Sequence, residues 1–318
     1  MRMRTTTALA LLAAVMTLPS GAAQAPARQV PTFRASADVV TVDVSVRDGS
    51  RVVTGLSADQ FVILDNGVPQ RVTDVSYGRL PIDVTVALDV SDSVTGRLLD
   101  QLRRAVGELM RDLRGDDRLK LILFNMRVSR VVDYTTDVAA VEAAIGTAAA
   151  GGGSSVRDAL AVALVSASAP ERRQLVVVFT DAADSSSTLA PDDLLDLAQR
   201  TNASVASVVP PLVQVAPVRP SAFLARTVVS SLFVRPAAAE GARLLERLAV
   251  ETGGTQLRVT PRGSLGATFR RVLENFRSSY VLHFTPQGVE RGGFHTLEVG
   301  VKGREGLTVR ARRGYFWR

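Results

Sequence analysis

The sequence contains no cysteine, only two histidines and only two lysines, Lys120 and Lys302, among its 318 residues. Without cysteine the chain has no disulfide, no thiol nucleophile, no thiolate metal ligand and no lipidated N-terminal cysteine. The scarcity of cysteine and histidine also disfavours zinc. Aromatic residues make up 5% of the chain, and no basic run is interleaved with them as base stacking requires. These absences argue against a nucleic-acid-binding protein.

The formal net charge is +7, and nearly all of the positive charge is arginine. We interpret this excess as solvated surface, while a hydrophobic content of 46% is enough to form a real core. The segment Ala8 to Leu18 is apolar, follows Arg2 and Arg4, and precedes small residues that suit cleavage after Ala22 or Ala23. This is typical of a signal peptide, and the stretch is shorter than the roughly 20 apolar residues that span a bilayer. We therefore expect residues 1–23 to be removed and the mature chain, without a transmembrane segment, to be exported to the periplasm or medium.

Residues 27–80 alternate apolar and polar side chains in short pieces, separated by turn signals at Asp48-Gly49 and Asn66-Gly67. This pattern predicts an antiparallel β segment. From Pro81 the pattern changes to strands that alternate with amphipathic helices, and QLVVVFTD is an unbroken apolar run typical of a central strand buried on both faces. Residues 81–277 therefore predict an α/β domain with a doubly wound, mostly parallel sheet.

Two segments do not follow the strand–helix alternation. Residues 210–239 carry five prolines and short apolar pieces without a clean period, which we interpret as an insertion in the α/β domain. Residues 278–318 return to antiparallel character, with a hairpin turn near Gly303 to Gly306. We expect them to pair with residues 27–80 into one β accessory unit, so that the α/β domain is inserted between the two halves of that unit.

Polar residues with side-chain oxygens follow two strands of the predicted sheet. Asp89 ends the first strand and is followed by Ser91 and Ser93, and Asp181 follows QLVVVFT. Ser154 lies in a glycine-rich loop that opens a helix. In open α/β sheets ligands bind at the carboxyl ends of the strands, so we expect these five side chains to converge at one edge.

An oxygen-only set of ligands suits a hard cation, of which Mg²⁺ is our first expectation and Mn²⁺ or Ca²⁺ the alternatives. If the hydroxyl groups provide most of the direct ligands, the bound ion keeps net positive charge. It can then accept a carboxylate from a partner protein. The sequence thus indicates a metal-dependent binding site made of Asp89, Ser91, Ser93, Ser154 and Asp181.

Other interpretations of these residues remain open. Ser91 or Ser93 could instead cap the following helix. A Mg²⁺-dependent, phosphatase-like hydrolase with Asp89 as the nucleophile is the enzymatic alternative, although Ser91 stands where such chemistry usually has a second carboxylate. A Ser-His-Asp hydrolase is disfavoured because His283 and His295 lie in the tail strands, where they face solvent or pack on the accessory sheet. No Lys-Ser/Thr pair follows Gly151 to Gly153, so a nucleotide-binding loop is also disfavoured.

The three motifs Asp89-Val90-Ser91-Asp92-Ser93, Gly152-Gly153-Ser154 and Thr180-Asp181 resemble the metal-ion-dependent adhesion site of von Willebrand factor type A domains. The resemblance covers Pro81 to about Phe276. The flanking segments GLSADQFVILDNGVPQRV, ETGGTQLRV, FRSSYVLHFTP and VRARRGYF are similar to those of exported bacterial VWFA-related domain proteins. This resemblance implies a protein-binding module, without enzymatic activity, that captures an acidic group of a partner protein.

The sequence differs from the family pattern at three positions. Ser154 stands where Thr is usual, which keeps the hydroxyl but loses the methyl group that fixes its rotamer. Asp92 and Ala182 both stand where Gly is common. Asp92 adds negative charge beside the site, and a positive φ at Ala182 would strain the backbone.

Overall fold

The computed structural model describes residues 39–166, 171–210, 225–260 and 263–317. Their elements alternate as the sequence pattern predicts, so the expected α/β fold with an antiparallel accessory unit is confirmed. The accessory unit contains β1 (Val40–Asp48), β2 (Arg51–Val52), η1 (Ala58–Gln60), β3 (Phe61–Asp65), β4 (Val68–Gln70), β5 (Val72–Tyr77), β12 (Tyr280–Phe284), β13 (Gly293–Val301), β14 (Thr308–Ala311) and β15 (Gly314–Trp317). The α/β domain contains β6 (Ile82–Asp89), α1 (Arg97–Asp112), β7 (Arg118–Phe124), β8 (Val128–Thr135), α2 (Val138–Gly146), α3 (Val156–Leu164), β9 (Arg173–Phe179), α4 (Pro191–Gln199), β10 (Ser204–Val209), α5 (Ala225–Thr252), β11 (Thr255–Arg258) and α6 (Leu265–Arg277).

The α/β domain is built on a six-stranded sheet in the order β11-β10-β9-β6-β7-β8. All neighbouring pairs are parallel except β7 and β8. Every residue of β6, β9 and β10 is buried, because helices cover both faces of these central strands. The strands therefore deliver their carboxyl ends to one edge, with β6 and β9 side by side in the middle.

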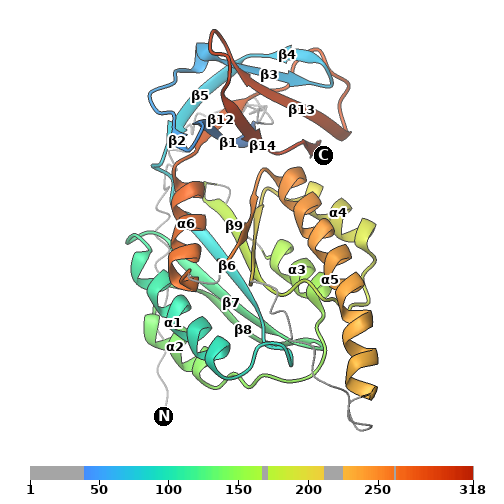
Figure 1. Cartoon of the computed structure of the whole chain (residues 1–318). Helices are drawn as coiled ribbons and strands as arrows, with labels where there is room; N and C mark the ends of the chain where they lie inside the picture. The colour runs from blue at the N-terminus through green and yellow to red at the C-terminus, as the bar shows by residue number, and fades with distance from the viewer. Residues whose placement is uncertain (1–38, 167–170, 211–224, 261–262, 318) are drawn as a thin grey trace, which may run out of the picture. The chain divides into compact units, whose positions relative to one another are not determined.

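Helices α1, α2 and α6 cover one face of this sheet, and α3, α4 and α5 cover the other (Figure 1). On the first face α1 packs Leu102, Val106 and Leu109 against the sheet, at the three- and four-residue spacing that predicts an amphipathic helix. Asp137 caps α2 by accepting hydrogen bonds from the amides of Ala139 and Ala140. Two hydrophobic cores, one on each face, thus hold the central strands in place.

The accessory unit contains two antiparallel sheets around a core of its own. One has the order β14-β1-β12-β5, with β2 paired to β1, and the other has the order β15-β13-β3-β4. Asn66 and Gly67 both have positive φ in the turn between β3 and β4, as expected of a two-residue hairpin loop. Strand β1 comes from the N-terminal flank, whereas its neighbours β12 and β14 come from the C-terminal flank. The chain therefore leaves the accessory unit after β5 and returns to it at β12.

Buried arginines join the accessory unit to the α/β domain. Arg173, at the start of β9, donates to Asp43 of β1 at 2.6 Å and to the Phe276 carbonyl and the Ser279 hydroxyl. Arg312 donates to Gly314 within the accessory unit and to the carbonyls of Gln199 and Thr201 and the Asn202 side chain after α4. Burial lowers the pKa of Arg312 to about 10, so its guanidinium remains charged at neutral pH.

Two adjacent glycines let the backbones of the two parts approach closely. Gly253 has a φ of 72°, and a Cβ there would lie 2.7 Å from the amide nitrogen of Arg312. A Cβ at Gly254 would collide with the carbonyl oxygen of Val205 in β10. The ETGGTQLRV segment therefore needs both glycines because it passes between β10 and the chain leading to β15.

His295 is buried in the accessory unit rather than exposed to solvent. Its Nδ1 lies 2.7 Å from Oδ1 of Asp65, and the hydroxyl of Tyr315 donates to Oδ2 of the same carboxylate. The His295 ring also contacts the rings of Tyr315 and Trp317. Burial and the Asp65 carboxylate raise the pKa of Tyr315. His283 lies on β12, where its Nδ1 contacts the Thr41 hydroxyl, so both histidines belong to the accessory unit.

Two expectations about local structure are wrong. Residues 225–239 belong to helix α5 instead of an irregular insertion, because most of the prolines precede Ala225 and Ala237 to Ala239 favour a helix. Residues 302–307 do not form a hairpin turn, since β13 pairs with β3 and β15 whereas β14 pairs with β1. That segment crosses from one sheet to the other, which allows Val309 and Ala311 to pack on the accessory core.

The proposed signal peptide, residues 1–23, and residues 211–224 of the expected insertion lie outside the described residues. Among the helices that the structure describes, none combines the length and the apolar character needed to cross a bilayer.

Candidate functional site at the carboxyl ends of strands β6 and β9

Asp89 is the last residue of β6 and is completely buried. Its Oδ1 accepts a hydrogen bond from the backbone amide of Ser91 at 2.9 Å, which bends the chain immediately after the strand. Its Oδ2 accepts hydrogen bonds from the hydroxyls of Ser154 at 2.7 Å and Thr180 at 2.8 Å. One carboxylate therefore connects the loops that follow β6 and β9 and the loop that precedes α3.

Ser91 and Ser93 lie in the loop between β6 and α1. Their hydroxyl oxygens are 3.2 Å apart, Ser91 is buried, and Ser93 is exposed. Helix α1 begins only at Arg97, and its N-cap residue, Gly96, provides no side-chain hydrogen bond. The helix-cap interpretation of these serines is therefore wrong, and their hydroxyls extend from Asp89 toward solvent.

Ser154 and Thr180 place two further hydroxyls beside Asp89. The loop that carries Ser154 is fixed by backbone hydrogen bonds from Gly151 to Val90 and from Asp92 to Gly152. Thr180, the residue after β9, was not among the site residues predicted from the sequence. Its position in the sequence could have predicted its place in the site. Thr180 stands at the end of a central strand, one residue before Asp181, so its hydroxyl lies at the same edge of the sheet as Asp89.

Asp181 lies next to Thr180 and is half-buried. Its Oδ1 accepts a hydrogen bond from the amide of Ala183, so Thr180 and not Asp181 makes the direct contact with Asp89. The next residue, Ala182, is buried and has a φ of 68°. This left-handed conformation is unfavourable for alanine. Helix α5 holds it in place, because Gly241 of α5 packs directly against the Ala182 carbonyl.

The carboxylate of Asp89 has no basic partner among the residues that the structure describes. Burial raises its pKa, and the hydrogen bonds from Ser91, Ser154 and Thr180 only partly offset this effect. A buried carboxylate surrounded by neutral hydroxyls is costly in its ionised form unless a positive charge approaches it. The electrostatics of the site therefore favour a cation.

The site provides oxygen ligands of low total charge, namely two carboxylates and the hydroxyls of Ser91, Ser93, Ser154 and Thr180. Within the described part of the chain, no cluster of three or more His, Cys, Asp or Glu side chains could hold a metal ion. Any cation here would thus depend on hydroxyl groups as well as on the two carboxylates, an oxygen-only set of ligands.

Replacing Thr180 with valine is expected to lower the free energy of unfolding by about 1–3 kcal/mol, because Thr180 is fully buried and its hydroxyl satisfies Asp89 Oδ2. Thr180→Ser keeps the hydroxyl and should retain more of the wild-type stability. Urea unfolding of the three proteins measures the difference. Equal stability of the valine and wild-type proteins would show that the Thr180–Asp89 hydrogen bond contributes nothing.

Residues 83–211 match the family model of the von Willebrand factor type A domain. This range contains both aspartates and all of the hydroxyl-bearing residues of the site. It begins in β6 and extends just past β10, so it contains five of the six strands of the parallel sheet. No curated protein sequence matches the chain.

The chain is also similar to solved structures at low sequence identity. An aerotolerance-related membrane protein from Bacteroides fragilis is 15% identical, with a TM-score of 0.42, over 61% of this chain and 98% of that one. A von Willebrand factor type A protein from Catenulispora acidiphila is 13% identical, with a TM-score of 0.48, over 90% of this chain and 75% of that one. Proximal thread matrix protein 1 of the mussel byssus, with a zinc-occupied MIDAS motif, is 11% identical, with a TM-score of 0.45, over 65% and 48% of the two chains.

Proposed function

Because the chain contains a von Willebrand factor type A domain, a fold that often mediates protein–protein binding, we propose that it is an exported, metal-dependent binding module. In this proposal Asp89, Ser91, Ser93, Ser154 and Asp181 hold a divalent cation, most suitably Mg²⁺, and Thr180 supports Asp89. The partner is a protein that presents an acidic side chain to the cation. A protein with these properties would act in adhesion or as a scaffold outside the cytoplasm.

The observation that carries this proposal is the environment of Asp89. Its carboxylate is fully buried and accepts hydrogen bonds from hydroxyls on two other loops, yet no basic side chain of the described residues pairs with it. Structural carboxylates at such depth are normally paired with a positive charge. Asp83, at the opposite end of the same strand, is an example, since it forms ion pairs with both Arg118 and Arg172.

In this proposal each side chain of the site has a distinct role. Asp89 supplies the buried negative charge, Ser154 and Thr180 orient that carboxylate, and the exposed Ser93 leaves the site open to solvent. When bound, a divalent cation supplies the positive charge that a partner's carboxylate requires. Since hydroxyls are neutral, much of that charge would remain available to the partner.

The surface around the opening contains an apolar side chain that a partner could cover. Met126, in the turn between β7 and β8, is 60% exposed. It lies beside the glycine loop, since a Cβ at Gly152 would be 3.1 Å from its Cγ. An exposed methionine next to a charged centre suits a protein interface, where a flexible apolar side chain adapts to the partner.

The alternative in which Asp89 acts as a nucleophile is not favoured by this geometry. Both of its oxygens accept hydrogen bonds within the protein, and the residue has no solvent-accessible surface. A nucleophile must reach the substrate directly, whereas Asp89 can act on a cation through the hydroxyls that it contacts. Type A domains are typically binding modules without catalytic activity, which agrees with this geometry.

The proposal is tested by calorimetric titration of Mg²⁺ and Mn²⁺ into the wild type and Asp89→Ala, together with thermal melts in the presence and absence of EDTA. Wild type should bind the ion, and Mg²⁺ at 100 times its dissociation constant should stabilise it by about 2.7 kcal/mol. Asp89→Ala should remain folded but bind no ion, because the residue that supplies the buried charge is missing.

Asp133→Ala provides the matched control. Asp133 is a strongly exposed carboxylate on β8, and its removal should leave ion binding unchanged. If the folded wild type binds neither ion and its melting temperature does not respond to EDTA, the proposed metal-dependent function is wrong. Export is tested separately by fractionating cells that express the full chain.

A further inference from the structure

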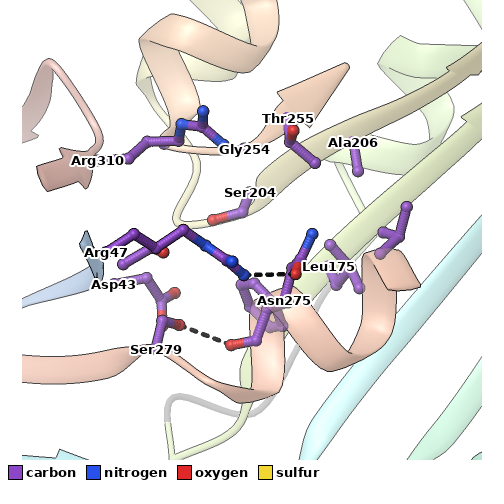
Figure 2. Close-up of a pocket in the computed structure, with 14 residues that line it drawn as sticks. Asp43, Arg47, Leu175, Ser204, Ala206, Gly254, Thr255, Asn275, Ser279 and Arg310 are labelled. Atoms are coloured by element: carbon purple, nitrogen blue, oxygen red, sulfur yellow. Dashed lines mark hydrogen bonds between the residues drawn. The ribbon is translucent and has the colours of Figure 1, made fainter. Parts of the chain in front are cut away.

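A small pocket lies between the accessory unit and the amino ends of strands β9 and β10, away from the edge that carries Asp89 (Figure 2). Its volume is about 50 Å³, which is room for several water molecules at roughly 10–15 Å³ each. The accessory unit lines it with Asp43, Ser45, Arg47 and Arg310, and the α/β domain with backbone and side chains that include Gly253, Gly254 and Thr255.

The polar side chains reach this pocket because of the two-residue period of β1. Val42, Val44 and Val46 face the accessory core, so the residues between them face the α/β domain. Ser45 lies opposite Arg310 of β14 in the antiparallel register, and Arg47 is two positions further along on the same face. These three side chains are therefore neighbours on one surface of the sheet.

The opposite wall exposes backbone and short side chains. Gly253 and Gly254 have no side chain to fill the space, and Thr255 adds a hydroxyl beside them, whereas the hydroxyl of Ser204 donates to the Thr252 carbonyl. Figure 2 shows Gly254, Ser204 and Thr255 across the pocket from Arg47. The glycines, required by the close backbone packing described above, thus also keep the pocket open.

The charges around the pocket do not balance. Asp43 is neutralised by Arg173, whose Nε lies 2.6 Å from its Oδ1. Among the described residues, Arg47 donates only to neutral acceptors, the Asn275 side chain at 2.6 Å and the Ser50 carbonyl at 2.9 Å. Arg310, exposed at the rim, forms no ion pair with any described residue. Two guanidinium groups at one pocket therefore have no paired carboxylate in the described part of the chain.

We infer that this pocket binds a small oxyanion through Arg47 and Arg310, with the hydroxyls of Ser45 and Thr255 as further hydrogen-bonding groups. Guanidinium groups form short, charge-assisted hydrogen bonds with phosphate and carboxylate oxygens. An anion here contacts residues of both the accessory unit and the α/β domain. Its binding therefore stabilises the junction between the two parts and needs no metal ion.

The inference is tested by titrating inorganic phosphate into the full chain, at constant ionic strength and with EDTA present so that no metal ion can bind the anion. Calorimetry should detect binding, and the amide resonances of Gly253 and Thr255 should shift. Arg310→Gln and Arg47→Gln should each weaken binding about ten-fold or more, because each removes a charge-assisted hydrogen bond. A parallel titration with acetate distinguishes a carboxylate from a phosphate ligand.

Arg304→Gln is the matched control, since Arg304 is an exposed arginine of the accessory unit outside the pocket. It should bind phosphate as the wild type does. Arg310 is exposed, so its replacement should not affect folding. The inference is overturned if the folded wild type binds neither anion, if Arg310→Gln binds as tightly as wild type, or if Arg304→Gln weakens binding equally. The last result would mean that general surface charge attracts the anion.

Discussion

Removing residues 279–318 is expected to abolish the protection of Val39 to Val46 against amide hydrogen exchange. Strand β1 pairs with β12 through Val40–Val44 and with β14 through Val44–Arg47, and the truncation removes both neighbours. The valines of β1 that are completely buried would become exposed, because Tyr280, Leu282 and Phe284 are lost from the accessory core. Exchange measured by mass spectrometry on the full and the truncated chain gives the result.

Strand β7 serves as the internal reference for this experiment. It lies inside the parallel sheet, and its hydrogen-bonding partners β6 and β8 remain in the truncated chain. Its protection shows whether the α/β domain still folds. Undiminished protection of β1 would contradict the pairing of the two flanks.

Gly241→Ala is expected to destabilise the protein, although glycine to alanine in a helix ordinarily stabilises by about 0.5–1 kcal/mol. The reason is that a Cβ at Gly241 would collide with the backbone carbonyl of Ala182, where no side chain can move away. We expect a loss of about 1–3 kcal/mol, as for other overpacked sites. Because Ala182 follows Asp181, divalent-ion binding should weaken as well.

Gly146→Ala is the matched control, since Gly146 ends helix α2 and a Cβ there would have no neighbouring atom within 4 Å. It should be neutral or slightly stabilising and leave ion binding unchanged. Urea unfolding and Mg²⁺ titration of both variants provide the comparison. A Gly241→Ala protein with wild-type stability and ion affinity would show that α5 does not support the loop after β9.

The general fold could be predicted from the sequence because each element carries a local signal. The apolar run of β9 indicated burial on both faces, and the Asn66-Gly67 turn indicated a hairpin. By contrast, the pairing partners of β14 depend on contacts far apart in the chain. The glycines at 303 and 306 indicate a turn, but they do not tell which sheet the chain enters afterwards.

The candidate site was predictable to a similar degree. Asp89 and Ser154 could be placed together because strand ends share an edge of the sheet, and their side chains are in direct contact. The role of Thr180 was missed because a threonine directly after an apolar strand also suits simple burial. The contact between Gly241 and Ala182 could not have been predicted, since it depends on how closely α5 approaches the loop after β9.

The insertion of the α/β domain between β5 and β12 has a consequence for the order of folding. Strand β1 is synthesised early, but it must wait for β12 and β14, whose residues follow the whole α/β domain in the chain. Closing so long a loop costs chain entropy and slows folding. The α/β domain, whose elements follow one another closely in the chain, can fold first. Tyr77 and Tyr280 flank this domain and pair in the native sheet. Folding of the domain therefore brings β5 and β12 close together and shortens the effective loop that must close when they pair. Maturation of the accessory unit is therefore expected to be the late kinetic phase.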